Sequence, residues 1–255
     1  MTRKRKRGGP PPGLIDEAPR RLKVSESGGE AARQLKTRVK TAKGRKLSST
    51  RWLERQLNDP YVAKAKAAGY RSRAAFKLLE LDEACRLLRP GMRVVDLGCA
   101  PGGWLQAAAK AAAAPERGRV VGIDLQAVEP VAGAMIFEMD FMSPEAPRIL
   151  SDAIGGSADL VMSDMAASST GHRQTDHLKI MALAEAALDF AESVLTPGGA
   201  FVCKMLRGGA ERGILDRLKQ SFANVRHIKP AASRQDSAEI YLVAKGFRGR
   251  AGSAD

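Results

Sequence analysis

Cysteine is scarce in this sequence of 255 residues, where Cys85, Cys99 and Cys203 are the only three. None of them forms a CxxC pair, and an odd, scattered set supplies neither a disulfide framework nor a zinc site. Because cysteine is among the residue types most often buried, we expect three buried thiols in a reducing compartment. No metal is expected.

Long apolar runs are also missing. The longest candidate, residues 105–114, is interrupted by Gln106 and Lys110 and falls short of the roughly 20 residues that a membrane helix needs. The basic N-terminus is followed at residues 8–12 by glycine and proline instead of the apolar core of a secretory signal. Both features predict a cytoplasmic protein that has no membrane partner.

Positive charge, by contrast, is in excess: 42 Lys and Arg against 28 Asp and Glu give a formal charge of +14. Residues 1–50 hold 15 Lys and Arg but only four Asp and Glu, so +11 lies there and +3 on residues 51–255. This excess favours a polyanionic partner, because Lys and Arg gain most against phosphate. Segment 1–50 lacks apolar periodicity, and we expect a disordered basic extension, either gripping that partner or merely solvated.

Hydrophobic periodicity predicts an α/β fold for residues 51–247, followed by a flexible tail at 248–255. Short apolar runs predict strands at 93–97, 120–124, 135–139, 159–164, 200–204, 225–229 and 239–244. Helical spacing predicts helices at 71–88, 104–114, 176–195 and 212–222. Because strands that alternate with helices need crossover connections, we expect a mostly parallel sheet with helices on both faces.

Polar residues stand at the carboxyl ends of five predicted strands, where open α/β sheets bind their ligands. These residues are Asp96, Asp124, Asp140, Asp164 and Lys204. The first strand also runs into a glycine-rich turn, residues 98–103, which allows a ligand to approach closely but is not the GxGxxG fingerprint of dinucleotide folds.

Two of these carboxylates suit an adenosine compound. Asp124 can accept both hydroxyls of a ribose, and Asp140 can accept from an adenine amino group. Taken singly, each can equally be a helix cap or a solvated loop residue. Trp104 either packs beside the pocket or is a structural residue at a helix start.

Five segments carry a family resemblance, and their order and spacing agree over residues 51–247. They are residues 72–78 (SRAAFKL), 95–104 (VDLGCAPGGW), 159–166 (DLVMSDMA), 202–204 (VCK) and 237–244 (SAEIYLVA). Together they resemble the FtsJ-type ribose 2'-O-methyltransferases of bacterial large-subunit ribosomal RNA. The sequence departs from that pattern at Ala167 and Ser168, where the family commonly has proline and asparagine, and in its long basic head.

The resemblance implies a Rossmann-like methyltransferase fold with an antiparallel C-terminal strand, and S-adenosylmethionine as cofactor. The implied cofactor residues are Gly102, Trp104, Asp124, Asp140 and Asp164. The family's catalytic Lys-Asp-Lys-Glu tetrad falls on Lys77, Asp164, Lys204 and Glu239, with Lys204 as the proton acceptor. The implied substrate is a uridine of 23S ribosomal RNA, in the A loop of an assembled or nearly assembled large subunit.

The chemistry of ribose methylation explains such a tetrad. The enzyme must align the hydroxyl oxygen with an already activated methyl group and accept one proton, without a metal. A lysine accepts a proton only when desolvation or a neighbouring cation lowers its pKa, and Lys77 can be that cation. In a weaker form of this hypothesis, Lys204 mainly orients the hydroxyl and the proton leaves late. Each tetrad residue could also be an ordinary surface charge.

Basic and aromatic residues alternate before the first core helix and can hold phosphates and stack on unpaired bases. They are Arg51, Trp52, Arg55, Tyr61, Lys64, Lys66, Tyr70, Arg71 and Arg73. A solvated helical face is the alternative.

Three other functions compete with this one. An RNA-binding protein with a vestigial methyltransferase fold is disfavoured by the intact tetrad, and a nucleotide-dependent oxidoreductase by the missing GxGxxG. Related enzymes act on transfer RNA or messenger caps, and the tetrad does not separate these substrates. We expect a monomer, since no extra apolar surface is apparent.

Overall fold

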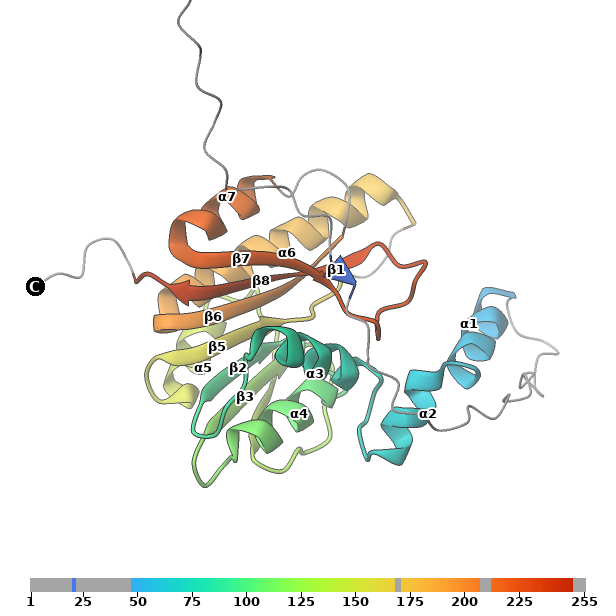
Figure 1. The fold of residues 1–255 in the computed structure, drawn as a ribbon, viewed down its shortest axis with the longest axis horizontal. Helices are drawn as coiled ribbons and strands as arrows, with labels where there is room; N and C mark the ends of the chain where they lie inside the picture. Colours follow the sequence, from blue (N-terminus) through green and yellow to red (C-terminus); the bar gives the residue numbers. More distant parts are fainter. Residues whose placement is uncertain (1–19, 22–46, 168–170, 207–211, 250–255) are drawn as a thin grey trace, which may run out of the picture.

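The structure is a computed structural model that describes residues 20–21, 47–167, 171–206 and 212–249 (Figure 1). The predicted extension 1–50 therefore lies outside the described residues except for Arg20–Arg21 and the start of the first helix. Most of the predicted tail 248–255, and Ser168 in the loop that departs from the family pattern, also lie outside them.

An eight-stranded sheet forms the centre of the domain, in the order β1-β7-β8-β6-β5-β2-β3-β4. The strands are β1 (Arg20–Arg21), β2 (Arg93–Leu97), β3 (Arg119–Asp124), β4 (Ala134–Glu138), β5 (Ala158–Ser163), β6 (Leu195–Leu206), β7 (Phe222–Lys229) and β8 (Glu239–Phe247). All neighbouring pairs are parallel except those of β8, which runs antiparallel to both β6 and β7. The predicted fold class, including the antiparallel C-terminal strand, is confirmed.

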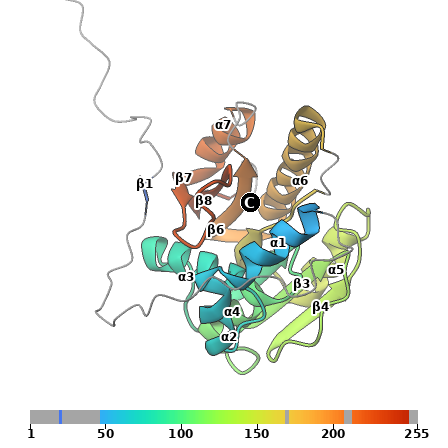
Figure 2. The ribbon, with the colours of Figure 1, turned by 90° about the vertical axis from the view of Figure 1, so that its right-hand side faces the viewer.

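Seven helices surround this sheet within the described part of the chain. They are α1 (Leu47–Leu57), α2 (Pro60–Ala67), α3 (Ala74–Cys85), α4 (Gly103–Ala112), α5 (Ala146–Ile154), α6 (Arg173–Val194) and α7 (Arg212–Ser221). α3 and α4 pack on one face of the sheet and α5, α6 and α7 on the other, while α1 and α2 extend from the domain beside α3 (Figures 1 and 2). None of the helices described is long and apolar enough to cross a membrane.

The two cores follow from the period of two along each strand. In β2, Val94 joins the α3–α4 core while Val95 and Leu97 join the α5–α7 core, and all three are fully buried. Cys85, Cys99 and Cys203 are buried and free, as expected.

Helix α3 is shorter than the predicted 71–88, and its C-terminus shows why. Arg86 adopts a left-handed conformation with φ of 51°. The Asp82 carboxylate then accepts the backbone N–H groups of Leu87 and Leu88, each at 2.7 Å, which draws the chain away from the helix axis. A side chain therefore provides the acceptor that the next helical turn would have supplied.

Candidate active site

The glycine-rich loop after β2 lies across the end of β3. The backbone N–H groups of Gly98 and Cys99 both donate to the carbonyl oxygen of Ile123, at 2.9 and 3.1 Å. Gly98 has φ of +78°, and a Cβ there would stand only 2.6 Å from Cγ of Met165. Glycine is thus required for this backbone conformation and for the close approach of the segment that follows β5.

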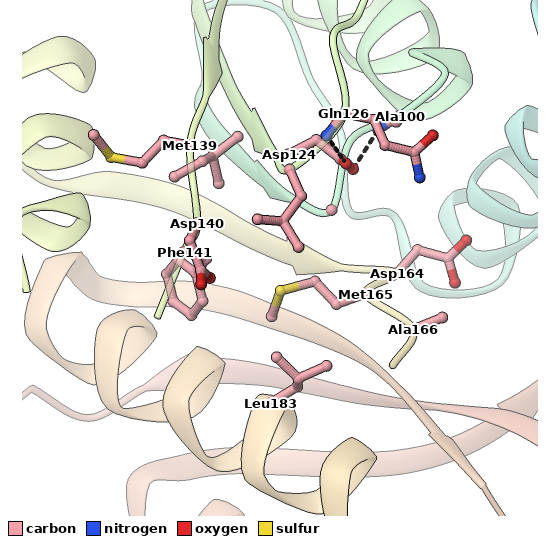
Figure 3. Close-up of a pocket in the computed structure, with 13 residues that line it drawn as sticks. Ala100, Asp124, Gln126, Met139, Asp140, Phe141, Asp164, Met165, Ala166 and Leu183 are labelled. Carbon is pink, nitrogen blue, oxygen red and sulfur yellow. Dashed lines mark hydrogen bonds between the residues drawn. The ribbon is translucent and has the colours of Figure 1, made fainter. Parts of the chain in front are cut away.

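A cavity of about 260 Å³ opens beyond the ends of β2, β3 and β5 (Figure 3). It is lined by Gly98, Ala100, Ile123, Asp124, Leu125, Gln126, Met139, Asp140, Phe141, Asp164, Met165, Ala166 and Leu183. In Figure 3, Asp124 lies at the top of the cavity, with Asp140 to its lower left and Asp164 to its lower right, and Leu183 approaches from α6 below. Three of the five predicted cofactor residues therefore share this cavity.

Backbone N–H groups hold the first two of these carboxylates. Asp124 accepts from Ala100 through Oδ2 at 2.8 Å and from Gln126 through Oδ1 at 2.9 Å, which ties the loop after β2 to the end of β3 (Figure 3). Asp140 accepts from the N–H of Met142 at 2.9 Å. Each carboxylate oxygen has two lone pairs, so both residues keep acceptor capacity for a ligand in the cavity.

Gly102 and Trp104, the other two predicted cofactor residues, are not among those that line the cavity. Gly102 packs against the guanidinium group of Arg71, 3.0 Å from where a Cβ would stand. The Trp104 indole is 3% exposed, and its Nε1–H donates to the carbonyl of Ala74 at 2.7 Å. In the structure Trp104 therefore joins α4 to α3, and its ring packs against that of Tyr241 in a tilted arrangement, with centroids 5.7 Å apart.

Asp96 is a buried acid beneath the loop. It is fully buried, and neither of its carboxyl oxygens has a hydrogen-bond partner within the described part of the chain. Burial, followed by the nearby charges of Asp164 and Asp124, raises its pKa well above the usual value. The raised pKa favours the neutral form of Asp96, which does not line the cavity. The carboxylates that do line it, Asp124, Asp140 and Asp164, suit a positively charged ligand that carries hydroxyl and ammonium donors.

The predicted tetrad comes together at the same edge of the sheet. Nζ of Lys204 lies 3.0 Å from Oδ1 of Asp164 and donates to its main-chain oxygen at 2.6 Å. Nζ of Lys77, from α3, lies 3.9 Å from Oδ2 of Asp164 and 3.2 Å from Oε2 of Glu239. The Lys204 side chain is 7% exposed and that of Glu239 is 28% exposed. The four side chains form one continuous network whose Asp164 also lines the cavity.

Tyr241 is part of this network, although its residue type and position alone gave no functional prediction. Its hydroxyl donates to Oδ1 of Asp164 at 2.7 Å and accepts from Nζ of Lys77 at 3.1 Å. The antiparallel register pairs Tyr241 directly with Lys204, which places both side chains on the same face. The sequence does contain a signal for Tyr241. If the strand with Glu239 is paired antiparallel with the strand that holds Lys204, Tyr241 falls opposite Lys204.

Charge and burial act in opposite directions on Asp164. Burial alone would raise its pKa, but Lys204 and Lys77, together with the hydrogen bond from Tyr241, outweigh it and hold the pKa below its usual value. Burial, then Asp164 and Glu239, raises the pKa of Tyr241 well above its usual value. Tyr241 therefore keeps its proton and remains a donor to an ionised Asp164.

Several candidate RNA contacts have partners within the fold. Arg71 donates to the carbonyl oxygens of Glu129 at 2.5 Å and Pro130 at 2.6 Å. The rings of Tyr61 and Tyr70 pack on Phe76, with centroids 5.7 and 5.9 Å apart. The side chains of Arg51 and Trp52 lie outside the described residues.

The last strand in the chain, β8, runs antiparallel between β7 and β6, and the other strands are parallel, with a carboxylate-lined cavity past the ends of β2 and β3. This is the arrangement of a Rossmann-like methyltransferase. The chain belongs to the FtsJ-like methyltransferase family, whose sequence profile matches residues 70–247.

Named relatives and a solved structure agree with this assignment. Ribosomal RNA large subunit methyltransferase E of Rhodospirillum rubrum is 58% identical over 252 residues, which cover 98% of this chain and 95% of the relative. The protein of the same name from Ruegeria pomeroyi is 60% identical over 232 residues, covering 89% and 100%. A crystal structure described as a ribosomal RNA methyltransferase of Plasmodium falciparum superposes with a TM-score of 0.62 at 30% identity, covering 71% of this chain and all of that one.

Proposed function

We propose that this protein transfers a methyl group from S-adenosylmethionine to the ribose 2'-hydroxyl of a uridine in 23S ribosomal RNA. The proposed target is the A loop of the assembled or nearly assembled large subunit. The observation that carries the proposal is the Lys77–Asp164–Lys204–Glu239 network at the rim of an acidic cavity. The relatives named as large-subunit ribosomal RNA methyltransferases support the RNA class.

The cavity suits S-adenosylmethionine by the chemistry of its lining. Asp124 and Asp140 keep free lone pairs for ribose and adenine donors, and Asp164, whose pKa is held below its usual value, supplies negative charge near a cationic ligand. When bound, that cofactor supplies an electrophilic methyl group on a sulfonium. In the proposed site, Gly102 and Trp104 do not line the cavity. They support the loop after β2 and the start of α4 from the side away from the cavity.

In the proposed reaction the chain's own residues hold the hydroxyl and take its proton. Two acceptors of Asp164 fix Nζ of Lys204, which leaves one direction on that nitrogen for the ribose oxygen. With Lys204 in its neutral form, the lone pair on Nζ takes the hydroxyl proton as the ribose oxygen bonds to the methyl carbon and the bond between that carbon and sulfur breaks. Asp164 and Glu239 orient the two lysines, and Lys77 places a second positive charge near the developing negative oxygen.

The test is methyl transfer from labelled S-adenosylmethionine to three substrates: isolated large subunits, naked ribosomal RNA and transfer RNA. Large subunits taken from cells that lack this methylation should accept one methyl per particle, recovered as 2'-O-methyluridine. Lys204→Ala should be inactive while still binding the cofactor. Preferential labelling of transfer RNA, or label on a base, would contradict the proposal.

A further inference from the structure

Helix α3 presents three charged side chains along one face toward β8 and the loop before it. Arg73, Lys77 and Glu80 follow each other at intervals of four and three residues, which places them on a common side of a helix. Lys77, in the middle, reaches Glu239 and Tyr241 at 3.2 and 3.1 Å. The mechanism above uses only this central residue.

The two outer residues, Arg73 and Glu80, bind the backbone of Ala232 in the loop between β7 and β8, residues 230–238. The Oε2 atom of Glu80 accepts the backbone N–H of Ala232 at 2.9 Å, and Nη2 of Arg73 contacts the Ala232 carbonyl oxygen. Ala232 is fully buried and Glu80 is 6% exposed. Both main-chain polar groups of Ala232 are thus satisfied by α3, on either side of the catalytic lysine.

A second set of contacts, from α2, fixes the side chains of Arg73 and Glu80 themselves. Asp59, which caps α2, contacts Nη1 of Arg73, and the hydroxyl of Tyr61 donates to Oε1 of Glu80 at 3.0 Å. Burial, then the charge of Glu80 and this hydrogen bond, raises the pKa of Tyr61 to about 12, so the donor keeps its proton. Helix α2 therefore holds both charged residues of α3 in place.

The same loop leads directly into Glu239. At its far end the Glu239 N–H donates to Oγ of Ser237 at 3.1 Å, and Nζ of Lys229 donates to the carbonyl oxygens of Gln235 and Ser237. The loop is therefore held near its start by α3 and near its end by β7. Between these supports it has little freedom to move Glu239 relative to Lys77.

We infer that Glu80 and Arg73 are positioning residues: by holding Ala232 they set the loop that places Glu239 against Lys77. This inference rests on the proposed function, because its consequence is a rate of methyl transfer. It gives a role to a buried carboxylate that does not touch the cavity. It also assigns Arg73, a candidate RNA contact by sequence, to the support of the active site.

The experiment compares variants of Glu80 in the full chain, with wild-type methyl transfer to large subunits as reference. Glu80→Ala should lower kcat about ten-fold, since a misplacement near 1 Å costs up to about 100-fold, while KM for S-adenosylmethionine stays within about two-fold of wild type. Glu80→Gln should restore the rate, because its amide oxygen accepts from Ala232 and its NH₂ reaches Tyr61. Glu80→Met, which fills the same space without an acceptor, gives the same test if the alanine variant does not fold.

Two further variants separate positioning from simple destabilisation. Glu192, a carboxylate of α6 that accepts from Ser221 at 2.7 Å and pairs with Arg217, lies outside the network. Glu192→Ala should lower stability and leave kcat unchanged. In a double-mutant cycle with Glu239→Gln, the rate losses of Glu80→Ala and Glu239→Gln should fail to multiply. Unchanged kcat in Glu80→Ala and Glu80→Met, or losses that multiply, would overturn the inference, whereas an inactive wild type would instead reject the proposed function.

Discussion

Tyr241→Phe removes one hydroxyl from the centre of the tetrad and changes nothing else in the shape of the core. That hydroxyl makes two hydrogen bonds to charged groups, one to Asp164 and one from Lys77. Such bonds contribute about 1.5–3 kcal/mol each. In the variant Asp164 retains its ion pair with Lys204, and Lys77 retains its ion pair with Glu239. The expected loss of unfolding free energy is therefore that of about one hydrogen bond, about 1.5–3 kcal/mol.

Urea unfolding at pH 7 measures this loss. Because the unfolding free energy falls by about 1–3 kcal/mol per molar urea, the midpoint should drop by roughly 1 M. In the same preparation kcat should fall about ten-fold, since Asp164 loses one of the donors that orient it, whereas KM for S-adenosylmethionine should change little. A variant as stable and as fast as wild type would refute the inferred role of Tyr241.

The same substitution has a signed pH effect. The depressed pKa of Asp164 stabilises the fold above the unfolded-state pKa of about 3.9, and this stabilisation is lost as pH falls through the lower folded-state pKa. Tyr241→Phe removes one cause of the depression. The acid-induced loss of stability, followed by thermal unfolding between about pH 2 and 6, should therefore be smaller in the variant and be complete at a higher pH.

Three more predictions follow from the cavity and the basic extension. Asp96→Asn should make the thermal midpoint of the free protein less dependent on pH above about 4, because the raised pKa of Asp96 costs wild-type stability as pH rises. An unchanged pH dependence would contradict the burial of an acid that has no partner among the described residues. Gly98→Ala should lower the thermal midpoint and abolish cofactor binding, since its Cβ would stand 2.6 Å from Met165, and normal binding would show that the loop can yield. Deleting residues 1–46 should reduce the salt dependence of methylation of large subunits; an identical rate and salt slope would show that the extension does not grip RNA.

Strands β2 to β8 were predictable because each of them carries its own apolar run. Strand β1, the pair Arg20–Arg21, has no apolar residue and falls in the extension that was expected to be disordered. Helix α5 was not among the predicted helices, although its buried residues Ala146, Leu150 and Ile154 stand at helical spacing. Helices α1 and α2 were also not predicted. For α2 a local signal was present, because Asp59 is the N-cap, its side chain accepts the N–H of Tyr61, and Pro60 is the first helical residue.

The tetrad residues were predictable from the family motifs, but their mutual geometry was not. Lys77 comes from a helix, Lys204 and Glu239 from antiparallel strands, and only the register of β6 with β8 brings Tyr241 among them. Likewise, the sequence places Asp96 at a strand end, but only the packing shows that its carboxyl oxygens have no hydrogen-bond partner among the described residues. The position of Trp104 behind the cavity also depends on a long-range bond, to Ala74.

The most direct measurement of the central claim is a single-turnover assay on large subunits, with wild-type protein and Lys204→Met compared at saturating S-adenosylmethionine. The methyl should be recovered as 2'-O-methyluridine. The variant, still binding the cofactor, should be slower by about 10²–10⁴-fold, the usual contribution of a general base. A variant that transfers methyl at the wild-type rate, or a product methylated on the base, would contradict the account.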